Sequence, residues 1–199
     1  GVSSAASDVY KRQGVMIEHL NVENYVSNLK RYVTLHSKDR VDFSTSIGFD
    51  LTVTTTICAL CEGAQVIVYG NSLQDVEAYK NHLIMNNIKV VKLVPSYFEL
   101  LIDVLPITTI NKVILGGEKL NDSLLRQLIN SYKNYKKEAN ITIYDEYGPT
   151  ETTVGTCINK VYSEKSLHTL SLGTTYNNYK AYVLDNNLNP MPIGAIGEL

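Results

Sequence analysis

The chain has 199 residues, 44% of them hydrophobic, which suits one large domain or part of a larger one. Its 18 basic and 20 acidic residues give a net charge of -2 with no long single-sign block, which argues against a nucleic-acid or membrane-binding surface. No apolar run approaches the roughly 20 residues that a membrane helix needs, and no segment resembles a signal peptide, so we expect a cytoplasmic protein.

The two ends of the chain differ from its middle. Residues 1–13, GVSSAASDVYKRQ, are small and polar and lack periodicity, and DVYKRQ resembles the translation of a sequencing adapter. We expect a non-native leader there, with a genuine linker as the alternative. From Gly14 we expect an α/β core over 14–162 and the truncated start of a β-rich subdomain over 163–199, where turn residues become frequent.

Between these ends, strand-like and helical patterns alternate. Runs rich in β-branched or aromatic residues predict strands, and apolar periodicity near 3.6 predicts helices. The expected strands are 41–44, 65–69, 89–94, 112–115, 141–144 and 180–184, and the expected helices are 22–33, 51–61, 73–85, 97–104 and 122–135. This order predicts an α/β fold with a mainly parallel sheet flanked by helices, whose ligands bind beyond the carboxyl ends of the strands.

The cysteines and histidines show no ligand spacing. The odd number of cysteines argues against a disulfide framework, and the CxxC pair Cys58 and Cys61 lies at the apolar end of an expected helix without a second ligand pair. We therefore expect buried thiols in preference to a metal or redox centre. The histidines are expected to be surface or packing residues: His19, His36, His82 and His168.

Two segments that lie at or after the ends of expected strands contain residues suited to ligand binding. The first, ILGGEKL at 114–120, has consecutive glycines that let backbone approach a bulky ligand, although alone it reads as an ordinary strand-to-helix connection. The second, YDEYGPTETT at 144–153, combines aromatic rings, a Gly-Pro turn, hydroxyls and carboxylates. Such groups can stack a base, bind phosphate oxygens and hold Mg²⁺; a polar turn is the alternative.

These segments resemble the adenylation domains of nonribosomal peptide synthetases, within the superfamily of adenylate-forming enzymes. YGPTETT looks like the core motif of the family. FSTSIGFDLTVTTTICALCEGAQVIVY, VILGGEKL and YVLDNNLNPMPIGAIGEL are similar to further motifs, in the family's order and spacing. The resemblance spans Gly14 to Leu199 and implies part of the large N-terminal domain of such an enzyme.

The resemblance implies an activity, a nucleotide site and partners. An amino acid would react with ATP to form aminoacyl-AMP, and would then load the phosphopantetheine thiol of a carrier protein beside condensation domains. Tyr147 would stack on adenine, Thr150 would contact phosphate and Glu151 would help to hold Mg²⁺. Asp145, at a position often occupied by Asn, could accept a hydrogen bond from the adenine amino group. The implied ATP-binding residues are Gly116, Gly117, Glu118, Asp145, Tyr147, Gly148 and Thr150.

Substrate selection can be approached from the residues themselves. Lys92 interrupts VVKLV, a run apolar enough for a strand covered on both faces, and a buried ammonium there would need a partner. Glu146, at the end of another expected strand, is a plausible one. The alternatives are that Lys92 snorkels from an edge strand and that Glu146 is a solvated loop acid.

The resemblance places the amino-acid pocket and suggests its substrate. The implied positions are Asp50, Leu51, Thr54, Lys92, Ile114, Gly116, Glu146, Val154 and Gly155. Asp50 would bind the substrate α-ammonium, and it could also serve as the N-cap of the helix that follows. The set resembles pockets that select asparagine, whose amide offers an oxygen to Lys92 and an NH₂ to Glu146. Aspartate is second, because its carboxylate would face Glu146 as a like charge.

Some family features are missing, and other functions stay open. The phosphate loop expected before GVMIEHLN is absent, and the later ribose-binding aspartate and catalytic lysine would lie beyond Leu199, so no catalytic residue is assigned and we expect little activity from this chain alone. The alternatives are an acyl- or aryl-CoA ligase of the same superfamily and a noncatalytic nucleotide-binding remnant.

Overall fold

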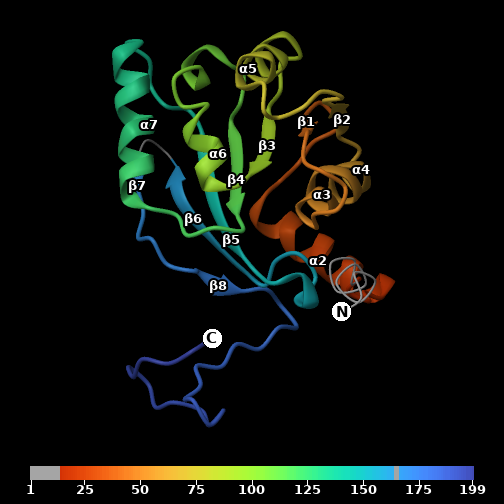
Figure 1. The fold of residues 1–199 in the computed structure, drawn as a ribbon, viewed down its shortest axis with the longest axis vertical. Coiled ribbons are helices and arrows are strands. Elements are labelled where there is room, and N and C mark those ends of the chain that lie inside the picture. Colours follow the sequence, from red (N-terminus) through yellow and green to blue (C-terminus); the bar gives the residue numbers. More distant parts are fainter. Residues whose placement is uncertain (1–13, 164–165) are drawn as a thin grey trace, which may run out of the picture.

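One twisted sheet with helices on both faces forms the centre of the computed structural model, which describes residues 14–163 and 166–199 (Figure 1). The described strands follow the order β2-β1-β3-β4-β5-β6-β7, and β8 also pairs with β6. Neighbours from β2 to β5 are parallel, whereas β6 is antiparallel to β5, β7 and β8. The strands are β1 (Arg40–Phe43), β2 (Gln65–Val68), β3 (Val90–Leu93), β4 (Lys112–Gly116), β5 (Thr142–Tyr147), β6 (Cys157–Ser163), β7 (Ser166–Leu167) and β8 (Thr174–Thr175).

The helices divide between the two faces and enclose two hydrophobic cores. On one face, Leu83, Phe98 and Leu125 pack against the sheet from α5, α6 and α7. On the other, Tyr25 and Leu29 of α2 pack with Cys58 and Ala59. The helical segments are α2 (His19–Tyr32), α3 (Leu51–Val53), the π-helical η1 (Thr54–Cys58), α4 (Ala59–Cys61), α5 (Val76–Met85), α6 (Pro95–Glu99), the 3₁₀ turns η2 (Leu105–Ile107) and η3 (Thr150–Thr152), and α7 (Asp122–Asn134). The expected α/β architecture is therefore confirmed.

The edge of the sheet differs from expectation at β5 and β6. The sequence predicts that a strand ends at Tyr144, but β5 continues to Tyr147, because β6 pairs antiparallel with it as far as Tyr147↔Cys157. The sequence pattern does not predict strand β6 itself, since polar Asn159 and Lys160 interrupt its apolar residues. The carboxylates expected in a loop consequently stand on a strand.

Other element boundaries shift for local reasons. The expected helix 97–104 instead begins at Pro95, whose ring suits the first turn, and ends at Glu99. The expected helix 73–85 begins at Val76, after Asp75, whose side chain accepts a 2.9 Å hydrogen bond from the Ala78 amide. The helix expected at 51–61 forms, with the π-helical segment η1 in its middle.

The strand expected at 180–184 does not form. Among the described residues, only Leu184 makes isolated bridges, to Pro190 and to Glu198, and Tyr182 and Val183 stay exposed. Backbone hydrogen bonds join Val183 to Met191 and Leu184 to Glu198, but the pairing does not continue along the segment, and β propensity alone does not provide a continuous ladder. The proposed leader, 1–13, lies outside the described residues, and no described helix is long and apolar enough to cross a membrane.

Candidate functional site

Adjacent carboxylates on β5 belong to opposite faces of the sheet. Side chains alternate along a strand, so Asp145 and Glu146 cannot point the same way. The Glu146 side chain meets Tyr25 of α2 and Lys92 of β3, on the face that α2 covers. Asp145 lines a pocket with Leu120, which belongs to the other core, and Glu146 is also part of that lining. One strand end thus contributes to two adjoining environments.

Lys92 and Glu146 form a buried ion pair. Their ammonium and carboxylate are in contact, and each side chain is only 2% exposed. Lys92 also donates to Thr54 Oγ1 at 2.7 Å and to the Tyr25 hydroxyl at 3.3 Å. The pairing inferred from the sequence is therefore present, and the alternatives of a snorkelling lysine and a solvated loop acid are wrong.

Two tyrosine hydroxyls complete the surroundings of this pair. Tyr25 lies 2.6 Å from Thr54 Oγ1 and 3.0 Å from Glu146 Oε1, and the Tyr176 hydroxyl donates to the same Oε1 at 2.7 Å. Burial first, and then the charge of Glu146, raises the pKa of both phenols, so they stay protonated donors. Burial also raises the pKa of the nearby Cys58 thiol to about 12, although Lys92 opposes the shift.

Only one assignment of protons satisfies this network. An ammonium only donates and a carboxylate only accepts, so Thr54 accepts from Lys92 and Tyr25 donates to Glu146. The single Tyr25 proton is then used, and Thr54 must donate to Tyr25. Every polar group of the cluster consequently has a partner, as buried charges require.

The remaining expected pocket residues surround this cluster unevenly. Ile114 is buried and lies beside Lys92 in the sheet register, while Gly116 lies beside Glu146. Gly155 packs directly on the carboxylate, because a Cβ there would lie 2.6 Å from Glu146 Cδ and Oε1. Val154 is also buried, on the face that α2 covers.

Asp50 and Leu51 stand apart at the start of α3. Asp50 occupies the N-cap position but makes no capping bond, and its half-buried carboxylate has no hydrogen-bond or ion-pair partner within 14–163 and 166–199. The expected capping role is therefore absent. The carboxylate remains available to a cationic ligand.

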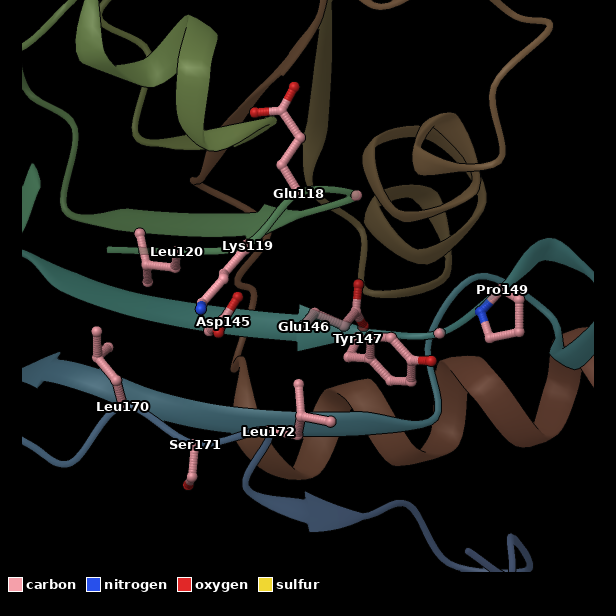
Figure 2. A pocket seen from close by; sticks show the side chains of 12 residues that line it. Glu118, Lys119, Leu120, Asp145, Glu146, Tyr147, Pro149, Leu170, Ser171 and Leu172 are labelled. Carbon is pink, nitrogen blue, oxygen red and sulfur yellow. The ribbon is translucent and has the colours of Figure 1, made fainter. Parts of the chain in front are cut away.

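A pocket of about 530 Å³ lies on the Asp145 side of β5 (Figure 2). Its lining includes most of the expected nucleotide residues: Gly117, Glu118, Asp145, Tyr147 and Gly148. Gly117 turns the chain after β4 with a left-handed φ of 80°, a conformation that glycine adopts without strain. Figure 2 shows the Tyr147 ring and Leu172 among the side chains of this lining, which offers apolar surface to a flat ligand.

Not every expected nucleotide residue lines this pocket. Gly116 and Thr150 are outside its lining, and Glu151 lines a second hollow beside α2. The Glu118 carboxylate accepts hydrogen bonds from the Ser96 amide and hydroxyl at 3.0 and 2.9 Å, at the start of α6. The exposed turn η3, which carries Thr150 and Glu151, follows directly after Pro149 of the pocket lining in the chain.

Burial changes the protonation of Asp145. The partly desolvated carboxyl has its pKa raised to about 6, close enough to neutrality that its charge depends on pH. It remains a hydrogen-bond acceptor in both forms.

Sequence reasoning missed several residues at these sites. Tyr25 and Tyr176 reach Glu146 from sequence separations of 121 and 30 residues, and in the sequence both look like ordinary aromatic residues. The segment between β7 and β8 adds Leu170, Ser171 and Leu172 to the pocket. The density of tyrosines in the later part of the chain is the only sequence signal that could have drawn attention to Tyr176.

The cysteines follow expectation only in part. Cys58 and Cys157 are buried, but Cys61 is exposed, because it lies at the end of α4 on the solvent side of its last turn. No group of three or more His, Cys, Asp or Glu side chains in the described part of the chain could hold a metal by itself. His82 Nε2 contacts Asp42 Oδ1 at 2.9 Å, and its ring stacks on that of Tyr79 with centroids 6.0 Å apart, which fits a packing role.

Comparison with protein families matches the description "AMP-binding enzyme" to residues 11–199. The chain belongs to the AMP-binding enzyme family. Its sequence is 34% identical over 194 residues to a mycosubtilin synthase of Bacillus subtilis, covering 95% of this chain and 7% of that protein. It is 33% identical over 195 residues to tyrocidine synthase 3 of Brevibacillus parabrevis, covering 94% and 3%. The chain thus spans a small fraction of the length of these relatives.

Solved structures of AMP-binding enzymes share the fold. The nonribosomal peptide synthetase FmoA3 superposes with a TM-score of 0.77 at 20% identity, over 90% of this chain and 19% of that one. The Vibrio cholerae adenylation domain AlmE, solved in complex with glycyl-adenosine-5'-phosphate, superposes with a TM-score of 0.73 at 19% identity, over 89% and 33%. The sheet and helices described above therefore have the same fold as part of each of these two structures.

Proposed function

We propose that this chain is the amino-acid- and ATP-facing part of an adenylation domain in nonribosomal peptide synthesis, and that the domain activates asparagine. The observation that carries the substrate assignment is the buried Lys92–Glu146 pair, on the face of the sheet that α2 covers. Relatives in the family include peptide synthases, and AlmE is solved with an aminoacyl adenylate of the kind this reaction forms.

The proposed reaction joins the carboxylate of the amino acid to the α-phosphate of ATP and releases pyrophosphate. Both reacting groups are anions, so the enzyme must align them and stabilise negative charge. Asp50 would hold the substrate α-ammonium, for which its unpaired carboxylate is suited. The aminoacyl group would pass to the phosphopantetheine thiol of a carrier protein in a multimodular synthetase.

The Asp145 pocket would hold the adenine of ATP. Tyr147 would stack on the base, Asp145 would accept from its amino group, and the backbone of Gly117, which lines the pocket, and of its neighbour Gly116 would lie along the edge of the base. Thr150 and Glu151, exposed on η3, would meet the phosphates. Mg²⁺ commonly binds through one or two carboxylates plus phosphate oxygens and water, so the single carboxylate of Glu151 fits that manner of binding.

An amide matches the Lys92–Glu146 pair better than a carboxylate does. The three ammonium protons of Lys92 are already used, by Glu146, Thr54 and Tyr25, and the 3.3 Å contact to Tyr25 is longer than the 2.7 Å contact to Thr54. An asparagine oxygen would replace the contact to Tyr25, while its NH₂ would donate to Glu146. Aspartate would bring a second negative charge against Glu146, so the pocket would disfavour it.

The test is amino-acid-dependent pyrophosphate exchange by the complete domain that contains this chain. Asparagine should give the fastest exchange, and faster exchange with aspartate would overturn the substrate assignment. Glu146→His should shift preference toward aspartate, because a neutral or protonated imidazole can donate to a carboxylate.

Two further measurements separate the proposed activity from other functions. Asp50→Ala should abolish amino-acid-dependent exchange, whereas a CoA ligase acting on acids without an ammonium would tolerate this change. ATP binding without exchange for any amino acid would instead favour a noncatalytic nucleotide-binding role. We also expect little or no exchange from the isolated 199-residue chain, and robust exchange would contradict this.

A further inference from the structure

Tyr176 contacts the proposed specificity carboxylate from outside the set of pocket positions that the sequence indicated. Its hydroxyl donates to Glu146 Oε1 at 2.7 Å, and its side chain is almost fully buried at 1% exposure. The hydroxyl has no other hydrogen-bond partner among the residues that the structure describes. Among the described residues, the Tyr176 hydroxyl thus acts only on Glu146.

A clamp from α2 fixes the position of Tyr176. The Asn28 side chain, itself buried, accepts from the Asn177 amide at 2.7 Å and donates to the Asn177 carbonyl at 3.0 Å. On the other side, the Tyr176 amide donates to the Thr156 carbonyl at 2.7 Å. The tyrosine is therefore held from two directions before any substrate binds.

This arrangement makes the two carboxylate oxygens of Glu146 unequal. Oε1 accepts from Tyr25 at 3.0 Å and from Tyr176 at 2.7 Å, which fills its ordinary accepting capacity. Oε2 accepts from Lys92 and has only a 3.4 Å contact with Tyr25 besides. An incoming N–H donor would accordingly find its acceptor at Oε2, next to the ammonium.

We propose that Tyr176 is a specificity-positioning residue, which holds Glu146 Oε1 so that Oε2, beside Lys92, is the acceptor presented to a substrate side-chain amide. This inference rests on the proposed function of the Lys92–Glu146 pair. The amide would then meet an adjacent donor and acceptor in a fixed order, with its oxygen toward Lys92 and its NH₂ toward Glu146. A carboxylate substrate has no N–H to offer Oε2, so the same arrangement works against it.

The experiment compares Tyr176→Phe with the parent in pyrophosphate exchange by the complete domain. Loss of a hydrogen bond to a charged group should lower kcat/KM for asparagine roughly tenfold or more, mainly through the KM for asparagine. The KM for ATP should stay unchanged. Aspartate should lose less, because a less firmly held Glu146 can turn away from it, so the asparagine-to-aspartate ratio should fall.

Tyr32→Phe is the matched control. Tyr32 packs against the Tyr176 ring with centroids 5.6 Å apart, but its hydroxyl contacts Thr174 and not Glu146, so the ratio should not change. Asn28→Ala provides a second test, because it keeps the Tyr176 hydroxyl but removes the clamp on the neighbouring backbone. It should also lower the asparagine-to-aspartate ratio.

The outcomes separate the inference from the proposed function. If the parent domain prefers another amino acid, the asparagine assignment fails, and the ratio is then measured between that amino acid and its runner-up. The inference is overturned if Tyr176→Phe and Asn28→Ala, in folded protein, lower exchange with both substrates by one common factor, since that is the result of a purely structural role. A change of ratio in these variants but not in Tyr32→Phe supports it.

Discussion

The losses of stability from breaking the buried ion pair on each side separately should sum to more than the loss from removing both charges together. Lys92→Met leaves the Glu146 carboxylate 2% exposed, with the Tyr25 and Tyr176 hydroxyls as its remaining donors. Removing one partner of a buried pair typically costs about 3–5 kcal/mol. We expect the lower end, about 3 kcal/mol, because charge-assisted hydrogen bonds from the two phenols persist.

The converse change leaves a less protected charge. Glu146→Gln leaves the Lys92 ammonium with Thr54, Tyr25 and an amide oxygen, so the expected loss is again at least about 3 kcal/mol. In a unit of roughly 150–250 residues, such a loss lowers the melting temperature by about 6–12 °C, and in a longer chain by less. The double variant has no buried charge at this position and should recover about half of the summed loss.

Thermal and urea unfolding of the complete domain without substrates would measure this coupling. The two single variants, the double variant and the parent form a double-mutant cycle whose interaction energy isolates the pair. Losses that simply add would show that Lys92 and Glu146 do not interact in the folded protein, and would remove the basis of the substrate assignment.

Three further changes probe the same region. Gly155→Ala places a methyl group 2.6 Å from the Glu146 carboxylate, so it should cost about 1–3 kcal/mol in urea unfolding and reduce asparagine-dependent exchange more than ATP binding; an unchanged exchange rate would contradict the close packing. Burial raises the pKa of Asp145 to about 6 from 3.8, so the folded state holds a proton that the unfolded state releases, and stability falls as pH rises through this window. Asp145→Asn should therefore raise the melting temperature at neutral pH but not near pH 4. Equal increases at both pH values would contradict the expected fall of stability with rising pH. In native protein, iodoacetamide should modify exposed Cys61 rapidly and leave buried Cys58, whose thiol pKa is raised to about 12, unmodified, as peptide mapping would show.

Local pattern was sufficient for the fold class and for part of the candidate site. The alternation of apolar strands with amphipathic helices predicts a parallel sheet, and β1 to β4 form where that pattern indicates. Lys92 inside an apolar run required a buried partner on energetic grounds alone, and Glu146 meets that requirement. These inferences succeed because the burial of a strand and the cost of an isolated charge can be judged from residues adjacent in the sequence.

Boundaries and partners at the sheet edge depended on contacts that local pattern does not contain. The antiparallel pairing with β6 extends β5 through Glu146, and the segment 180–184 makes only isolated bridges, at Leu184, instead of the expected strand. Cys61 is exposed although its helix is apolar, because only one side of α4 faces the core.

The sequence by itself determined the α/β architecture, the family motifs and the need for a counter-charge to Lys92. Only the tertiary structure decided that Tyr25 and Tyr176, at sequence separations of 121 and 30 residues from Glu146, would donate to one oxygen of its carboxylate. The physical reason is that apolar periodicity is a property of neighbouring residues, whereas a hydrogen bond between distant segments exists only after the sheet and its helices have packed.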